Sequence, residues 1–258
     1  RGINGATPAG EVDQRVVHIN EFFTMSVYNN ICRSLFERHK ILFSFIMCVK
    51  ILQGEGLVDS LEYRFLLSGI SGKDQESEYP QDASDWLPTN IWADLLSMSG
   101  LEAFKEFPTE FPKQLATWKE IFDSHEPQKC AFPEAFAQVT PLQRLCLLRC
   151  LRRDKTELAM QDYITAYLDE RFIQPPPFDL KACYNDSTPI SPLIFILSTG
   201  SDPNKDLDIL AAQLDMQDRL KRIALGQGQG KKASNLVEKG CANGDWVMLQ
   251  NCHLSISW

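Results

Sequence analysis

The stretch SPLIFILSTGSDPNKD, residues 191–206, opens the part of the chain whose pattern decides the fold. It predicts an apolar strand over 193–198, then a turn, then a helix over about 204–217. A strand, a helix and a strand follow over about 221–226, 231–242 and 246–250. Near-continuous apolar strands that alternate with helices are typical of a buried parallel sheet with right-handed crossovers. This order of elements is that of a nucleotide-binding α/β domain.

The turn after the first predicted strand carries the wrong residues for a phosphate-binding loop. Such a loop reads G-x-x-x-x-G-K-[ST], whereas residues 200–206 read GSDPNKD. Asp202 before Pro203 is typical of a helix N-cap followed by proline at the first helical position. A carboxylate there would satisfy the free amides itself and would repel a phosphate. We interpret this turn as a degenerate phosphate loop made of Gly200, Ser201, Asp202, Pro203 and Lys205, and weak anion binding is the alternative.

Three glycines follow the second predicted strand. Gly226, Gly228 and Gly230 are spaced G-x-G-x-G, whereas a dinucleotide-binding turn has its third glycine one position later. A tight turn in which glycine takes a positive φ explains the pattern without a ligand. The alternative is a turn that binds a nucleotide or a methyl donor, which would make this domain part of an enzyme.

The last predicted strand ends in amides. Gln250 and Asn251 stand where an ATPase places acidic residues for magnesium and the attacking water, so we interpret them as a degenerate Walker B position. Neutral amides serve both purposes poorly. The four histidines share no metal-ligand spacing. We therefore predict no catalytic residue, no metal site and no cofactor in this chain, which keeps the shape of a nucleotide fold without its chemistry.

Composition argues against several classes of function. The net charge of −8 speaks against nucleic-acid binding, which needs a basic surface. The longest apolar run, residues 41–49, is far shorter than the roughly 20 residues that cross a bilayer, so no membrane span is expected. The eight cysteines include no CxxC pair. We expect buried, reduced thiols and a reducing compartment such as the cytoplasm.

The first half of the chain is predicted to be helical. Residues 1–15 lack periodicity and are expected to form a flexible lead. Apolar residues from Val27 to Leu52 recur at helical spacing and predict one helix, which ends at residues 53–56. The acidic, aperiodic segment 71–85 is expected to be an exposed loop.

Capping residues predict where further helices begin and end. The predicted starts are Asp59 (with Glu62 as a capping box), Thr89, Thr140 (followed by Pro141) and Asp154 (with Glu157 as a second capping box). Gly69 is expected to end the first of these helices, and the last is expected to run to about Glu170. The run Pro175–Pro177 predicts a stiff linker and the best domain boundary.

Three arginines cluster just before this linker. Arg149, Arg152 and Arg153 lie at the predicted junction of two helices. Most such clusters are solvated or form local ion pairs. In a ring of ATPase modules, an arginine at a module edge can instead reach a neighbouring module. We therefore keep these three residues as possible inter-module contacts.

With these motifs in view, the chain resembles the dynein heavy chain within its AAA+ motor ring. The matching segments are SLFERHKILF (34–43), GEG (54–56), FLLSG (65–69), LLRCLR (147–152), SPLIFILS (191–198), GSDP (200–203), LGQGQG (225–230) and WVMLQNCHL (246–254). Together they span about residues 20–258. The glycine turn resembles the axonemal branch of the family more than the cytoplasmic one.

The resemblance implies an α+α/β fold: a helical subdomain like an AAA+ small domain, then a partial parallel-sheet AAA+ domain that lacks its last strands. The implied parts are a flexible lead (1–19), the end of the fifth module (20–138), helices and a linker (139–177) and the start of the sixth module (178–258). AAA+ sheets are ordered 5-1-4-3-2, so the fourth strand would lie between the first and the third. We expect a fragment or truncated isoform that cannot complete the sheet alone and leaves apolar edges unpaired.

The implied role is structural and force-relaying within a motor for microtubule-based movement. Its partners would be neighbouring AAA+ modules of the same heavy chain. Dynein intermediate and light chains and microtubules would bind regions outside this chain, and ATP and magnesium would bind at other modules. The implied location is the cytoplasm and cytoskeleton, in the axoneme of a cilium or flagellum. A helical adaptor with a vestigial sheet remains a further alternative.

Overall fold

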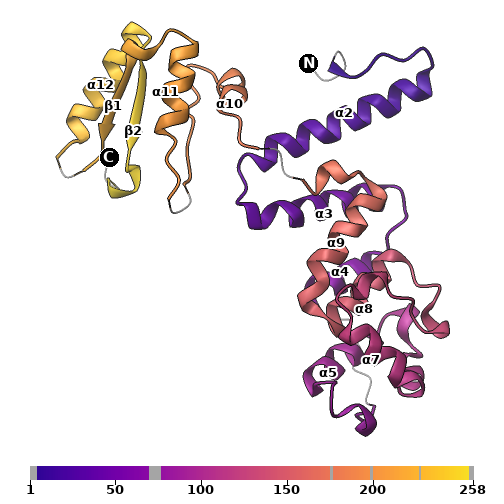
Figure 1. The fold of residues 1–258 in the computed structure, drawn as a ribbon. Helices are drawn as coiled ribbons and strands as arrows, with labels where there is room; N and C mark the ends of the chain where they lie inside the picture. The colour runs from indigo at the N-terminus through magenta and orange to yellow at the C-terminus, as the bar shows by residue number, and fades with distance from the viewer. Residues whose placement is uncertain (1–4, 70–76, 175–176, 198–199, 227, 256–258) are drawn as a thin grey trace. The chain divides into compact units, whose positions relative to one another are not determined.

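The computed structural model describes residues 5–69, 77–174, 177–197, 200–226 and 228–255 (Figure 1). The chain divides into two compact units, Arg1–Pro176 and Pro177–Trp258. The first unit is helical and the second contains a small parallel sheet. No helix in the described ranges is long and apolar enough to span a membrane.

The first unit contains eight helices among its described residues, joined by loops and short 3-10 turns. They are α2 (Val12–Cys32), α3 (Glu37–Gly54), α4 (Ser60–Ser68), α5 (Thr89–Met98), α6 (Phe107–Glu110), α7 (Leu115–Asp123), α8 (Pro141–Leu151) and α9 (Thr156–Tyr167).

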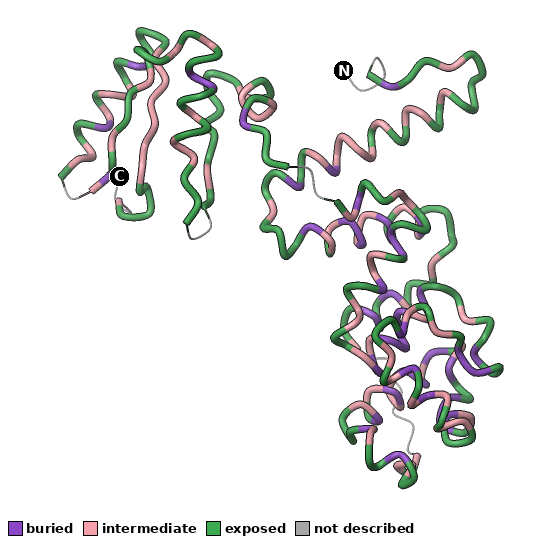
Figure 2. The backbone as a smooth tube through the Cα atoms, viewed as in Figure 1, coloured by how far each residue is buried: buried purple, intermediate pink, exposed green. Residues whose placement is uncertain are grey.

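The core of the first unit is built around α8, which packs against α4, α5 and α9. Beside it lies a cluster of aromatic rings. The ring centroid of Phe107 lies 5.2 Å from that of Phe111, 5.6 Å from that of Trp118 and 5.2 Å from that of Phe136. Buried residues accordingly concentrate in this part of the first unit (Figure 2). Burying one large apolar side chain stabilises the fold by about 1.5–3 kcal/mol relative to leaving it in water. Each pair of neighbouring aromatic rings adds about 0.5–1.5 kcal/mol.

The single helix predicted from Val27 to Leu52 is wrong, because the chain turns at residues 33–36 between α2 and α3. The Ser34 hydroxyl donates to the Ile31 carbonyl at 2.8 Å and helps to end α2. The turn brings the ring of Tyr28 to 6.4 Å from that of Phe43. In a straight helix these residues would lie roughly 22 Å apart along the axis, so packing of Tyr28 favours the break.

Helix α2 also begins earlier than the sequence suggests. It starts at Val12, inside the segment predicted to be a flexible lead. The Arg15 guanidinium donates to the carbonyls of Ala6 and Thr7 at 2.8 and 2.7 Å. These contacts tie the preceding residues to the first turns of the helix. Residues 1–4 lie outside the described part of the chain.

Several predicted caps are confirmed. The Asp59 carboxylate accepts from the amides of Leu61 and Glu62, and Gly69 ends α4 with φ 73°. The Thr140 hydroxyl and the Gln143 side chain form a reciprocal capping box at the start of α8. The helix predicted from Thr89 is α5, which begins at that residue.

The two predicted acidic capping boxes, Asp59 with Glu62 and Asp154 with Glu157, are wrong. Asp59 caps α4, but the Glu62 and Asp154 side chains bind other partners. Glu62 accepts a 2.6 Å hydrogen bond from Gln143 Nε2, and burial raises the pKa of this carboxyl. Asp154 accepts from Arg152. Helix α9 therefore begins at Thr156 without a side-chain cap and ends at Tyr167, short of Glu170.

The second unit contains five described helices and strands. They are α10 (Leu180–Asp186), α11 (Asn204–Gln213), β1 (Leu220–Ala224), α12 (Gly230–Asn243) and β2 (Trp246–Gln250). The two strands pair in parallel, with Leu220 opposite Trp246 and Ala224 opposite Gln250. They match the second and third predicted strands, and α12 forms the crossover between them.

The first predicted strand is wrong over its described residues, 193–197, which form neither helix nor strand. Ile194 and Ile196 are 81% and 72% exposed. A strand needs hydrogen-bonding partners on a neighbouring strand, and β1 and β2 use their shared edge for each other. In the expected strand order the first strand does not neighbour either of them. Residue 198 lies outside the described part of the chain.

The expectation of buried thiols is met only in part. Cys32, Cys48, Cys146 and Cys150 are buried, all in the first unit. Cys241 and Cys252, in the second unit, are exposed. The helical core encloses its thiols because they lie on inward faces of α2, α3 and α8.

Candidate functional site: the carboxyl edge of the sheet and a cluster of arginines

The carboxyl ends of β1 and β2 meet at one edge of the sheet in the second unit. This edge is where α/β domains bind nucleotides. The chain leaves β1 there through the glycine turn, and the Leu225 amide donates to the Gln250 carbonyl at 2.7 Å. Helices α11 and α12 begin at this same lower edge (Figure 1). All three segments singled out from the sequence of this half therefore gather in one place.

At the phosphate-loop position, the Asp202 carboxylate is already occupied. Its Oδ1 accepts from the Asn204 backbone amide at 2.9 Å and from Asn204 Nδ2 at 2.6 Å. These hydrogen bonds, the backbone one first, lower the pKa of Asp202. Helix α11 begins at Asn204, one residue later than the motif suggests, with Pro203 just before it. The carboxylate thus caps the first amide of the helix.

The other phosphate-loop residues offer little to a ligand. Gly200 has a φ of 85°, which only glycine adopts readily. Ser201 and Lys205 are exposed. Lys205 is followed by Asp206, so no hydroxyl stands in the position that would hold magnesium.

The Walker B position is tied to the same helix. Gln250 Nε2 donates to Asn204 Oδ1 at 3.1 Å. Asn204 in turn donates to Asp202, so three side chains form a continuous hydrogen-bonded chain. We call Asp202, Asn204 and Gln250 the amide bridge. Asn251, next along, is exposed and lies in the left-handed region with φ 56°.

Backbone conformation explains why a glycine stands in the turn after β1. Gly228 has a φ of 75°, and the Gln229 amide donates to the Gly226 carbonyl at 3.2 Å. Helix α12 begins at Gly230. Of the three glycines, only Gly228 needs a conformation that other residues avoid. Residue 227 lies outside the described part of the chain.

ATP with magnesium does not fit this edge. A phosphate at the start of α11 would meet the Asp202 carboxylate, which lies on the amide that the phosphate would need. Gln250 and Asn251 supply neutral amides where magnesium needs carboxylates. The described residues also include no group of three or more His, Cys, Asp or Glu side chains placed to hold a metal ion.

Arg149, in the first unit, packs inside its own unit. Its guanidinium lies 5.7 Å from the centre of the Phe65 ring. A Cβ added to Gly69 would lie only 2.6 Å from Arg149 Nη2. The side chain therefore fills the space beside the end of α4 and depends on a glycine there.

Arg152 joins the end of α8 to the end of α7. Its Nε and Nη2 atoms donate to the two Asp154 carboxylate oxygens, each at 2.8 Å. Its Nη1 atom donates to the carbonyls of Phe122 and Ser124. The hydrogen bond from Arg152 lowers the pKa of Asp154. The Arg152 side chain is only 17% exposed, so it acts as an internal clamp.

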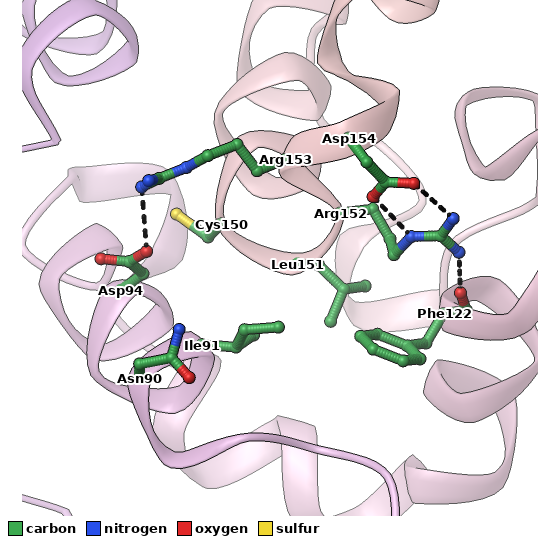
Figure 3. A pocket seen from close by; sticks show the side chains of 9 residues that line it. All are labelled: Asn90, Ile91, Asp94, Phe122, Cys150, Leu151, Arg152, Arg153 and Asp154. Carbon is green, nitrogen blue, oxygen red and sulfur yellow. Dashed lines mark hydrogen bonds and ion pairs between the residues drawn. The ribbon is translucent and has the colours of Figure 1, made fainter.

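Arg153 is the arginine of the three that faces outward. Its side chain is 69% exposed and makes one 3.3 Å contact, from Nη2 to Asp94 Oδ2. It borders a cavity of about 280 Å³ between α5 and the end of α8. Figure 3 shows the Arg153–Asp94 pair on one side of this cavity and the Arg152–Asp154 pair on the other.

The cavity also includes residues that the sequence did not single out. Asn90 and Asp94 come from α5, and Phe122 comes from α7. No sequence motif links them to Arg153, because only the packing of α5 and α7 against α8 brings them together. Cys150 lines the same cavity, and burial raises its pKa to about 12, so its thiol stays protonated near neutral pH.

Comparison with known proteins finds similarity to dynein heavy chains. Residues 188–258 match the family model described as the dynein heavy chain region D6 P-loop domain. Dynein axonemal heavy chain 1 of Rattus norvegicus is 42% identical over 258 residues, which is 100% of this chain and 6% of that protein. Dynein axonemal heavy chain 12 of Mus musculus is 40% identical over 249 residues, 96% of this chain and 8% of that protein. Dynein axonemal heavy chain 2 of Homo sapiens is 37% identical over 251 residues, 97% of this chain and 6% of that protein. The chain therefore spans 6–8% of the length of these relatives.

Proposed function

Because the chain belongs to the dynein heavy chain family and is similar to its axonemal members, we propose that it is a structural, non-catalytic segment of a dynein motor ring. Residues 20–138 would form the end of the fifth AAA+ module, and 139–177 would lead into the sixth. Residues 178–258 would form part of the sixth module's α/β core. The first unit would be like an AAA+ small domain and the second a partial AAA+ sheet.

The amide bridge is the observation that carries this proposal. A catalytic edge would hold its ligand with free amides, a lysine and acidic side chains. Here Asp202 and Gln250 instead bind the same residue of the chain, Asn204. The edge thus satisfies its own polar groups, which is the behaviour of a structural joint. In the intact ring, ATP and magnesium would bind at other modules.

The cluster of Arg149, Arg152 and Arg153 supports a relaying role. Arg149 and Arg152 fix the ends of α4, α7 and α8 to one another, and rigid junctions of this kind transmit movement between packed elements. Arg153, whose ion pair with Asp94 is exposed, is the residue of the three that could contact a neighbouring module of the same heavy chain. Intermediate chains, light chains and microtubules would bind elsewhere on the heavy chain. The site of action would be the cytoskeleton of a cilium or flagellum.

A fluorescent-nucleotide titration of the 258-residue chain tests the proposal. We expect no saturable binding with or without magnesium, and the same flat response for Lys205→Ala. Saturable, magnesium-dependent binding that Lys205→Ala abolishes would instead support a nucleotide-binding enzyme. If Gly228→Ala abolished binding and Lys205→Ala did not, the ligand would lie at the glycine turn.

A further inference from the structure

The amide bridge has a fixed direction. The ionised Asp202 carboxylate can only accept hydrogen bonds, so the Asn204 side chain must present its Nδ2 amino group to it. The Asn204 Oδ1 atom is then left on the opposite side of the side-chain amide, facing Gln250 at 3.1 Å. An oxygen in that position needs a donor. The residue at position 250 must therefore donate.

We infer that Gln250 is a positioning residue whose amide locks the start of α11 onto the carboxyl end of β2. The inference explains why an acid is unsuitable at this place. A glutamate has the same shape as glutamine but, when ionised, offers only acceptors. It would face Asn204 Oδ1 with another oxygen, and Asn204 could turn to meet it only by abandoning Asp202. The need for a hydrogen-bond donor thus gives a structural reason for an amide rather than an acid at position 250.

The lock acts at the first residue of α11, whereas the buried Leu210 and Ala211 and the ion pair of Asp208 with Arg222 of β1 hold the helix further along. Gln250 is half-buried at the end of β2, and Asn204 is the first residue of α11. Before α11, residues 193–197 do not pair in the sheet, and all of them except the half-buried Phe195 are exposed. The hydrogen bond from Gln250 therefore acts on the start of α11, where these other contacts do not reach.

A polarity reversal tests this inference. In Gln250→Glu, exchange of the amide hydrogens of α11 should become roughly fivefold faster, the effect of losing one hydrogen bond. In Asp202→Asn/Gln250→Glu the direction of the bridge can reverse: Asn204 Nδ2 donates to the glutamate, and Asn204 Oδ1 accepts from the new asparagine amide. The net charge equals that of the starting protein. Exchange in α11 should be slower than in Gln250→Glu but should not return fully to that of the starting protein, because the reversed bridge removes the acceptor that Asp202 Oδ1 gives the Asn204 backbone amide.

Matched variants separate this rescue from general effects. Gln217→Glu makes the same change of charge at an exposed position of the second unit. Added to the starting protein, Gln217→Glu should leave exchange in α11 unchanged. Added to Asp202→Asn, it should leave exchange as it is in Asp202→Asn alone. Gln250→Met removes the donor and keeps the length of the side chain. It should speed exchange as Gln250→Glu does, and Asp202→Asn should not rescue it.

Two outcomes would overturn the inference. One is Gln250→Glu exchanging like the starting protein. The other is Asp202→Asn failing to rescue Gln250→Glu, including the case in which Gln250→Glu alone leaves the second unit unfolded and the double variant does not refold it. The inference rests on the proposed function only in treating this edge as non-catalytic. Nucleotide binding by the unaltered chain would refute that function, whereas the polarity test reads a hydrogen bond in the absence of nucleotide.

Discussion

The two units of this chain differ in how far they bury their apolar residues. In the first unit the rings of Phe104, Phe107, Phe111 and Trp118 are wholly buried. In the second unit the buried apolar residues among those described are Leu180, Leu210, Ala211, Leu225 and Ala233. The first unit therefore has a core of its own, and the second has only the beginning of one.

The difference teaches how the two kinds of element bury their surface. A helix satisfies its own backbone and needs only a neighbour for its apolar stripe. A buried strand needs a hydrogen-bonding neighbour and packing on both faces. Residues 193–197 have the sequence of a buried strand, yet Ile194 and Ile196 remain mostly exposed. The same apolar content therefore contributes far more stability in the helical unit.

The largest expected effect comes from cutting the aromatic core of the first unit. Phe107→Ala should lower the free energy of unfolding of this unit by about 3–5 kcal/mol, because the ring is fully buried among other rings. Urea denaturation followed by tryptophan fluorescence measures this loss. Ile194→Ala, which shortens an exposed side chain in the second unit, should change stability by less than about 0.5 kcal/mol. Equal losses in the two variants would contradict the comparison.

A smaller effect should separate two neighbouring arginines. Arg152→Ala should cost about 1–3 kcal/mol, since it leaves the carbonyls of Phe122 and Ser124 without their donor. Arg153→Ala should cost less than about 0.5 kcal/mol, because its ion pair with Asp94 is exposed. Thermal unfolding of the two variants side by side measures the difference. If Arg153→Ala were the more damaging of the two, the clamp assigned to Arg152 would be wrong.

In the second unit, the glycine turn provides a comparison of similar size. Gly228→Ala should cost about 1 kcal/mol, because alanine is strained at a φ of 75°. Gly226→Ala should be close to neutral, since its φ is not positive and a Cβ there would meet no atom within 4 Å. Hydrogen exchange at the start of α12 measures both changes. The same loss in both variants would show that the turn serves something other than its backbone.

The smallest expected effect is a dependence of the first unit on pH. The Arg152 hydrogen bond lowers the pKa of Asp154 below its ordinary 3.8 in the folded chain. The ionised carboxylate therefore contributes stability above about pH 3.8, and that contribution is lost as the pH falls through the lowered pKa. Urea midpoints at pH 5 and pH 3 should differ less for Asp154→Asn than for the starting protein. In an Arg152→Ala background, Asp154→Asn should no longer alter this difference.

Local rules allowed much of the fold to be predicted. Caps such as Asp59, Thr140 and Gly69 act on their own helix, so their roles follow from neighbouring residues. The strand at 246–250 was predicted from its apolar run, and the strand at 220–224 was predicted at about 221–226 from the alternation of strands with helices. The break between α2 and α3 was not predicted. It allows Tyr28 to pack against Phe43 and against Phe172, which lies far along the chain.

The candidate site divides in the same way. Sequence alone suggested that Asp202 would cap the helix after it and that Gln250 replaces an acid. It could not reveal that both bind Asn204, because the chain brings residues 46 positions apart into contact only through the sheet. Nor could it separate Arg152 from Arg153, since only the position of α7 and of Asp94 distinguishes their surroundings.

The most direct test of a closed, ligand-independent sheet edge is hydrogen exchange of the 258-residue chain with and without millimolar ATP and magnesium. A ligand at 100 times its Kd would stabilise its site by about 2.7 kcal/mol, which would slow exchange strongly. We predict no change at residues 200–206 or 228–232. Slowed exchange confined to these two turns would mean that the edge binds nucleotide, and would contradict the account.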